Sequence, residues 1–240
     1  MLITNLRTAI GVVLGAALAG CGLISSDVTD FDLTLPDKKF TIDVDGWSVD
    51  DANAATYLER SCAGAPPTAC NSAVQEACAT GCSGSCNETS QTCDLTLEVS
   101  RVQPVNLVME KPELQSLNDE PVIKVTIDSI TYDVAVNTLN IDTPPITVYI
   151  APISVTTVRA NDPSVKAIGT IDPVPAGQTT TTAQPLKLTA TGKAELVTIM
   201  SNFKTPFNVL VGSSIVVTAG QDIPTGKLDA VVHIKGHAGI

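Results

Sequence analysis

The sequence predicts a mainly β protein whose strands form an antiparallel β-sandwich. From Leu95 onward, apolar and polar residues alternate with a period of two, as Val232 and Ile234 do with His233 and Lys235. Such strands have one apolar and one polar face, and two sheets can bury their apolar faces against each other. Prolines fall between these runs or at their ends, where no ladder hydrogen bond is lost. One further stretch, near residues 192–203, has helical spacing and predicts a single packed helix.

The expected strands of the sandwich body, residues 94–240, follow from these runs. They cover 95–99, 122–128, 130–136, 146–155, 166–171, 186–190, 207–218 and 227–236. Residues 31–48 supply the first strands, because Phe31, Leu33 and Leu35 alternate with polar neighbours and the pattern returns from Phe40 onward. The turn-forming residues 36–39 between the two runs predict a hairpin.

The helix near 192–203 is expected to begin after Thr191 as N-cap. Leu196, Ile199, Met200 and Phe203 then form one apolar stripe at helical spacing. Such a stripe is typical of core packing, so we expect this helix to lie against the sandwich.

Residues 49–93 predict a helical, disulfide-rich insert. Ser48 is the expected N-cap of a helix over 49–60. Asn71 or Ser72 is the expected cap of a second short helix through Ala79, and residues 81–93 are expected to form a loop. A segment so rich in small polar residues buries little apolar surface, so cross-links must supply stability. Six cysteines fall here: Cys62, Cys70, Cys78, Cys82, Cys86 and Cys93.

These six cysteines are expected to form three disulfides with a pairing that the sequence leaves open. Structural zinc is the competing interpretation. The C-x3-C-x3-C spacing from Cys78 to Cys86 lacks the paired C-x2-C motif of zinc sites, and neither histidine is near it in the sequence. No metal ligand and no cofactor is therefore predicted.

Residues 1–20 predict an export signal, since Arg7 precedes an apolar core too short to cross a membrane. The sequence Leu18-Ala19-Gly20-Cys21 that follows resembles the lipobox of bacterial lipoproteins. This resemblance implies cleavage before Cys21, a diacylglycerol on its sulfur and a palmitate-type acyl group on the new amino terminus. Several acyl chains anchor stably where one does not.

Lipidation would explain why Cys21 stands apart from the other six cysteines. Residues 21–30 would then be a lipidated tether, and an exported chain meets conditions in which disulfides persist. The expected location is the cell envelope. Gly22 stands where some lipoprotein families have an aspartate that retains them in the inner membrane, so we expect the outer membrane if the host has one.

Residues 173–217 resemble, in the order of their parts, the second half of the water-stress and hypersensitive-response domain of group-two late embryogenesis abundant proteins. A Pro-Ala-Gly turn at 175–177 leads to a strand, a helix and a long strand. The resemblance implies an Ig-like sandwich of seven strands with one helix and a protective role without catalysis. The family's Asn-Pro motif is absent from the expected place, where Thr143-Pro144 stands instead.

Charge and motifs exclude several classes of function. The formal net charge is −11, and loss of residues 1–20 with Arg7 leaves 13 basic against 25 acidic residues, or −12. This charge argues against nucleic acid as a partner. The sequence has no nucleophile elbow, phosphate loop or H-E-x-x-H motif, so no catalytic residue is predicted and the protein is not expected to be an enzyme.

Two weak metal motifs are better explained otherwise. His233 and His237 share one strand face, but no third ligand is indicated, which favours surface histidines. The acidic run from Asp43 to Asp51 lacks the spacing of a calcium loop, which favours a turn.

Three classes of function remain. The leading prediction is a non-enzymatic lipoprotein, held by the lipid on Cys21, that acts as a binding, adhesion or scaffolding module for an unidentified envelope protein. Its contact surface would be the acidic loops or the cysteine-rich insert. A carrier or sensor of an apolar ligand such as a lipid is the alternative, and a stress-protective protein is the second alternative. A cavity between the sheets would favour the carrier, and a solid core would favour the other two.

Overall fold

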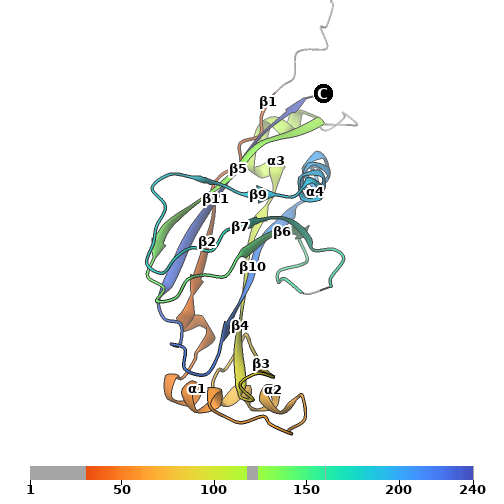
Figure 1. The fold of residues 1–240 in the computed structure, drawn as a ribbon. Coiled ribbons are helices and arrows are strands. Elements are labelled where there is room, and N and C mark those ends of the chain that lie inside the picture. The colour runs from red at the N-terminus through yellow and green to blue at the C-terminus, as the bar shows by residue number, and fades with distance from the viewer. Residues whose placement is uncertain (1–30, 118–123, 160, 240) are drawn as a thin grey trace, which may run out of the picture.

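The computed structural model describes residues 31–117, 124–159 and 161–239, and these residues form two antiparallel sheets that pack face to face (Figure 1). The first sheet has the order β1-β11-β5-β8, with β2 also paired to β11. Its strands are β1 (Phe31–Asp32), β2 (Lys38–Asp43), β5 (Lys124–Asn137), β8 (Gln184–Pro185) and β11 (Lys227–Gly239). The mainly β, two-sheet architecture predicted from the alternating runs is confirmed.

The second sheet has the order β3-β4-β10-β6-β7-β9. Its strands are β3 (Cys82–Cys86), β4 (Cys93–Val105), β6 (Ile146–Pro152), β7 (Lys166–Ile171), β9 (Lys187–Leu188) and β10 (Phe207–Val217). β10 is its central strand, since it pairs with β4 along its whole length and with β6 over residues 207–212.

The core between the sheets consists of the apolar positions of the alternating runs. On β11, Leu228, Ala230, Val232 and Ile234 are all buried, as their spacing predicts. Val209 on β10 is fully buried in the same apolar cluster. At roughly 25 cal/mol per Å² of apolar surface, this burial is the main stabilising contribution to the fold.

The two expected strands 122–128 and 130–136 are one strand, β5, in the structure. The core-facing positions of β5 change from odd to even residue numbers. Val125 and Ile127 face the core in the first part, and Ile130 and Tyr132 face it in the second. The register with β11 shifts where Lys235 pairs with Ser129 and Gly236 with Ile127. This bulge restores the inward orientation after the break in the period, so a single bent strand replaces two.

The expected hairpin in residues 31–48 is wrong. β1 pairs with residues 237–238 of β11, and β2 pairs with residues 227–232 of the same strand. Between them, the backbone N–H groups of Leu33 and Leu35 donate to the carbonyl oxygens of Gly236 and Ile234 at 2.8 and 3.0 Å. The turn-forming residues 36–39 therefore do not reverse the chain, and β1 and β2 lie end to end along one edge of β11.

Side chains of β4 cover the other edge of β2. Arg101 Nε donates to the carbonyl oxygen of Thr41 at 2.8 Å, and Gln103 Nε2 donates to that of Lys39 at 2.6 Å. These bonds join the two sheets along one side of the sandwich. They also use carbonyl groups that an edge strand would otherwise present to another chain.

Lys38 was expected in a turn, but it lies at the start of β2 and is buried, with 7% of its surface exposed. Its Nζ lies 2.7 Å from Oε1 of Glu110, at the end of the short helix α3 (Leu107–Glu110). A 3-10 helix, η3 (Pro112–Leu117), follows. Neither helix was predicted, because four and six residues are too few to show a helical period.

The helix predicted near 192–203 is α4 (Ala190–Ser201), and it packs against β5 and β7. Its N-cap is Thr189, whose side chain accepts a hydrogen bond from the backbone N–H of Gly192 at 2.8 Å, so the predicted cap at Thr191 is wrong by two residues. Leu196 and Met200 are fully buried, which confirms the stripe as core packing. None of the described helices is long and apolar enough to cross a membrane.

Candidate functional site

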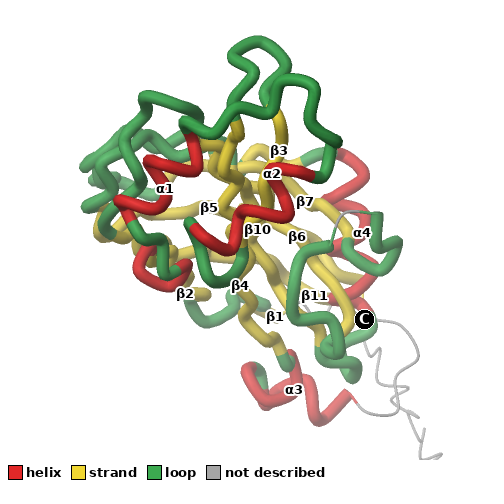
Figure 2. The backbone as a smooth tube through the Cα atoms, turned by 90° about the horizontal axis from the view of Figure 1, so that it is seen from below, coloured by secondary structure: helices red, strands yellow, loops and turns green. Residues whose placement is uncertain are grey.

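Residues 49–93, together with their disulfides, form the end of the molecule opposite β1 and α3 and are called the cysteine-linked end below (Figure 1). Figure 2, which views the molecule from below, shows α1 and α2 lying across the ends of the strands. The elements are α1 (Asp51–Leu58), α2 (Ala69–Ala73), the 3-10 helix η2 (Val74–Glu76) and β3. A further 3-10 helix, η1 (Val44–Trp47), leads into it from β2.

All six cysteines of this end are paired. The disulfides join Cys62 to Cys86, Cys70 to Cys93, and Cys78 to Cys82, with Cα atoms 5.9, 5.5 and 6.3 Å apart. The prediction of three bridges is confirmed, and the structure supplies the pairing that spacing left open. Two bridges span 24 and 23 residues and fix the segment after α1 and helix α2 to the β3–β4 hairpin. The third closes a local loop of four.

The local structure differs from the sequence prediction at three points. The second helix, α2, has Thr68 at its N-cap position and ends at Ala73, so the expected cap at Asn71 or Ser72 and the expected end at Ala79 are wrong. Asp50, and not Ser48, is the N-cap of α1, because its carboxylate accepts from the backbone N–H of Asn53 at 2.8 Å. Ser48 ends η1 instead. The stretch expected as a loop over 81–93 contains strand β3, because pairing with residues 93–97 of β4 outweighs its low intrinsic strand preference.

Tyr57 of α1 anchors this end to the sheet. The ring is buried, and the hydroxyl lies 3.2 Å from the carbonyl oxygens of both Cys70 and Asp94, so it donates to one of them at a time. Burial, followed by the negative charge of Asp94, raises the pKa of Tyr57 to about 12. The phenol therefore stays protonated at physiological pH and acts as a fixed donor between the helix, a disulfide and β4.

Gly84 of β3 lets the backbone of α2 approach closely. A Cβ atom at this position would meet the Tyr57 hydroxyl and lie 2.7 Å from the carbonyl oxygen of Cys70. The backbone N–H of Gly84 donates to Oδ1 of Asn71 at 3.2 Å. A side chain at Gly84 would separate β3 from α2, beside the Cys70–Cys93 bridge.

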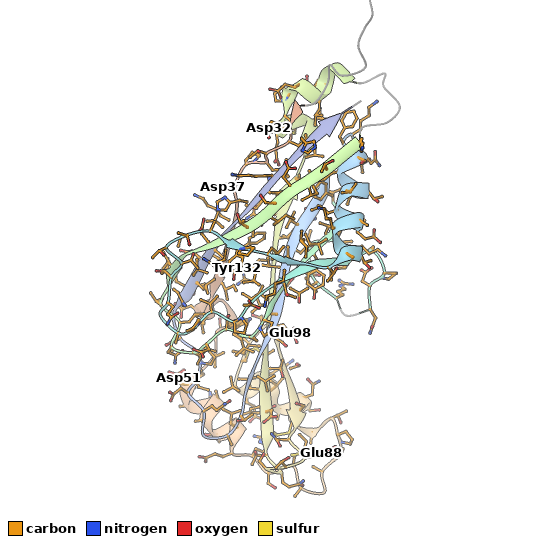
Figure 3. All side chains as sticks on the ribbon, turned by 45° about the horizontal axis from the view of Figure 1, so that its top comes forward. Asp32, Asp37, Asp51, Glu88, Glu98 and Tyr132 are labelled. Carbon is orange, nitrogen blue, oxygen red and sulfur yellow. A yellow bond between two sulfur atoms is a disulfide. The ribbon has the colours of Figure 1, made fainter. Side chains whose placement is uncertain are left out.

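The outer surface of the cysteine-linked end is polar and exposed. Glu88 lies in the β3–β4 turn, at the end of the molecule opposite Asp32 (Figure 3). Arg60 and Glu76 form an exposed ion pair at 2.6 Å. These side chains stand on a cross-linked backbone, so a contact at this surface would cost little ordering entropy.

The acidic run Asp43 to Asp51 forms turns and caps. The carboxylate of Asp43 accepts from the backbone N–H of Asp45 at 3.1 Å, and Asp50 caps α1. In the part of the chain that the structure describes, no group of three or more histidine, cysteine or acidic side chains is arranged to hold a metal ion.

The two histidines lie on the outer face of the first sheet, each beside a carboxylate. His233 of β11 is 2.7 Å from Asp37 through Nδ1 and 2.6 Å from Asp133 through Nε2. Burial lowers the pKa of His233, but its hydrogen bonds to Asp133 and Asp37 and their negative charges outweigh this and raise the pKa above 6.5. His237 lies 3.0 Å from Asp128.

Sequence reasoning placed both histidines on one face but missed these carboxylates. Asp37 and Asp133 are 196 and 100 residues from His233, so no spacing pattern reveals them. When protonated, His233 donates to both carboxylates and links the segment between β1 and β2 to the middle of the sheet. The arrangement is suited to a structural cross-link.

Two small cavities lie between the described parts of the two sheets. Each measures about 10 Å³, one beside Phe40 and Val211 and one beside Leu139 and Ile215. A volume of this size admits about one water molecule. Larger hollows lie on the surface: one of about 600 Å³ lies between residues 141–144 and the end of β10, and one of about 660 Å³ adjoins it along the outer face of the second sheet.

Comparisons with known protein families, curated proteins and solved structures found no match to this chain. Cys21, the lipobox and the expected signal peptide lie outside the described residues.

Proposed function

We propose that this protein is a lipid-anchored, non-enzymatic binding module of the cell envelope, held by a lipid on Cys21. The observation that carries the proposal is the position of the cysteine-linked end, at the opposite end of the molecule from β1, where the described chain begins (Figure 1). Residues 21–30 would reach at most roughly 35 Å when extended. The anchor and the cross-linked surface then lie at opposite ends, and the surface faces away from the membrane.

The small volume between the sheets favours this function over the carrier of an apolar ligand. Cavities of about 10 Å³ leave no place for an acyl chain without separating the sheets. Separation would expose apolar core at a cost of roughly 25 cal/mol per Å². A solid core is equally compatible with a stress-protective role, which stays as the second candidate.

We further propose that the sandwich is Ig-like and that residues 49–93 are an insert in it. Support comes from the number of longer strands, since seven of the described strands, β2, β4, β5, β6, β7, β10 and β11, have six or more residues. The resemblance to the late embryogenesis abundant sandwich implies the same number. Within residues 49–92, only the five-residue β3 joins a sheet as a strand, and Cys93 begins β4.

Membrane fractionation tests the anchor. Cys21→Ser should move the protein from the membrane to the soluble fraction of a bacterial host, because the acyl chains supply the membrane affinity. Cys78→Ser serves as the control, since it removes a cysteine without removing the proposed lipid site and should leave the protein in the membrane. Membrane attachment of the Cys21→Ser protein would overturn the anchor.

Site-specific photocrosslinking in the intact cell tests the contact surface. A photoreactive residue at Glu88 should give a defined adduct with an envelope protein, whereas the same residue at Thr181, exposed on the sandwich body, should not. Equal crosslinking at the two positions would contradict the proposed surface. A lipid recovered in equal molar amount with the purified Cys21→Ser protein would instead support the carrier.

A further inference from the structure

The central strand β10 loses one of its two neighbours part of the way along. It pairs with β4 through Val217, but its pairing with β6 stops where Gly212 lies opposite Thr147. Among the described residues, no strand pairs with residues 213–217 on the side away from β4. Every second residue of this stretch therefore directs its backbone N–H and C=O away from β4, where no strand accepts or donates to them.

Two prolines account for the lost neighbour. The next positions beyond Thr147 and Ile146 toward the start of β6 are Pro145 and Pro144, which would lie opposite Ser214 and Ile215 if the register continued. Proline has no backbone N–H and cannot donate to a ladder. The chain leaves β10 here, and the carbonyl oxygen of Pro145 accepts from the hydroxyl of Ser213 at 2.9 Å instead.

The departure of the chain leaves a groove, called the edge groove below. One wall is residues 214–217 of β10, the other is residues 141–144, and residues 220–224 form its end. Asn140 holds the second wall in place, because its side chain donates to the carbonyl oxygen of Ile223 at 3.0 Å and accepts from the backbone N–H of Thr225 at 2.7 Å.

The groove has the size of a short piece of strand. Its volume is about 600 Å³. A strand residue in a sheet occupies roughly 160 Å³, from a rise of about 3.3 Å, a strand spacing of about 4.8 Å and a sheet spacing of about 10 Å. About four residues in extended conformation would therefore fill it.

The negative charge of the groove indicates which kind of segment can bind there. Asp142 and Asp222 line it, Glu98 lines the adjoining hollow, and neither hollow has a lysine, arginine or histidine among its lining residues. A second copy of this chain would bring the same acidic edge against itself. A segment carrying lysine or arginine brings opposite charge, which favours a basic partner over self-pairing.

We infer that the edge groove binds an extended, basic segment of a partner protein, which adds a strand beside residues 213–217 of β10. Main-chain hydrogen bonds to the open edge give affinity in this mode of recognition, and alternate side chains give specificity. Val216, half exposed at 51% of its surface, supplies an apolar contact on the outer face. The site uses other residues than the cysteine-linked end and does not depend on the lipid anchor.

Binding of defined peptides to the full chain tests the inference. The probe is a fluorescent octapeptide of alternating lysine and valine, followed by fluorescence anisotropy. It should bind saturably, whereas a glutamate–valine peptide and a lysine–valine peptide methylated at every backbone nitrogen should not, because the first has the wrong charge and the second has no backbone donor to give to the edge. Absence of saturable binding, or equal binding of the N-methylated peptide, would overturn strand addition.

Variants and hydrogen exchange locate the binding. Asp142→Asn and Asp222→Asn should each weaken binding about two- to fivefold, the effect of one partly exposed charge pair. Glu195→Gln, the same loss of charge on helix α4 and away from both hollows, should leave it unchanged. The lysine–valine peptide should slow amide exchange within residues 213–217. Slowing elsewhere only, or slowing in the protein alone as its concentration rises, would overturn the inference, the latter in favour of self-pairing.

Discussion

The sandwich body buries the apolar faces of long strands such as β10 and β11, whereas the cysteine-linked end has three short helical pieces and one five-residue strand. In the body, stability comes from apolar area removed from water. In the cysteine-linked end, two long disulfides and the buried donor Tyr57 add to the burial of a few apolar side chains such as Leu58 and Val74. The comparison shows that one chain can use two different means of stabilisation, each where its sequence demands it.

The largest effect is expected from a cavity in the sandwich body. Leu196→Ala, on the buried side of α4, should lower the free energy of unfolding by about 2–5 kcal/mol, because it removes apolar contact and leaves a void. Urea denaturation measures the loss. Val216→Ala is the control, since this side chain is half exposed, and its effect should stay within about 0.5 kcal/mol. Equal losses would contradict a body held by core packing.

Removal of a long disulfide should have the next largest effect. Replacing both Cys70 and Cys93 by alanine releases a loop of 23 residues and should cost about 3 kcal/mol by the loop-entropy relation. The same change at Cys78 and Cys82, four residues apart, should cost about 2 kcal/mol or less. Similar losses for the two pairs would show that loop length does not govern stability here.

Reduction of the disulfides in the native protein compares the stability of the sandwich body with that of the cysteine-linked end. With a thiol reductant, amide exchange should quicken within α1 and α2, because their cross-links to the hairpin are gone, while β10 and β11 stay protected by their ladders and core. Hydrogen exchange read by mass spectrometry distinguishes the two regions. Loss of protection in β10 at the same rate would mean that the body also depends on the bridges.

A smaller effect is expected from the Tyr57 hydroxyl. Tyr57→Phe removes a buried donor from between two carbonyl oxygens and should lower the free energy of unfolding by about 1 kcal/mol. Tyr149→Phe on β6 is the matched control, because this residue is half-buried and its change should stay within about 0.5 kcal/mol. Thermal unfolding of the three proteins gives the ranking.

The smallest effect should depend on pH. Because the folded pKa of His233 is raised above 6.5, its contribution to stability is fully present below about pH 6.5 and is lost as the pH rises through the folded value. The contribution should be below about 1 kcal/mol, since the cluster is partly exposed. His233→Gln should remove this pH dependence, and Asp37→Asn should remove part of it. A difference between wild type and His233→Gln that grows with rising pH would contradict the sign.

The sequence predicted the body well because its pattern is local. The alternating run at 227–236 became β11, and the range 166–171 is the range of β7 in the structure. The stripe of Leu196 and Met200 identified the inner face of α4. Each of these features repeats over several residues, so the period is readable without knowing the partner.

Where the prediction failed, long-range contacts decided the structure. The hairpin in 31–48 was wrong because β1 and β2 both pair with a strand about 200 positions further along the chain. β3 formed because β4 was available to pair with it. The disulfide pairing and the carboxylates around His233 depend on the fold as a whole. The edge groove exists because two prolines would lie opposite β10, and only the register between β10 and β6 shows this.

The end-to-end placement of β1 and β2 along β11 has a mechanical consequence. A force on Phe31 directed away from the cysteine-linked end acts along these strands. Their hydrogen bonds to β11 are then loaded in shear and resist the force together. In a hairpin at the same place, the hydrogen bonds would break one after another. Forced unfolding is governed by the rate of crossing its barrier. The bonds from Arg101 and Gln103 to the other edge of β2 add to that barrier, so β1 and β2 resist a pulling force.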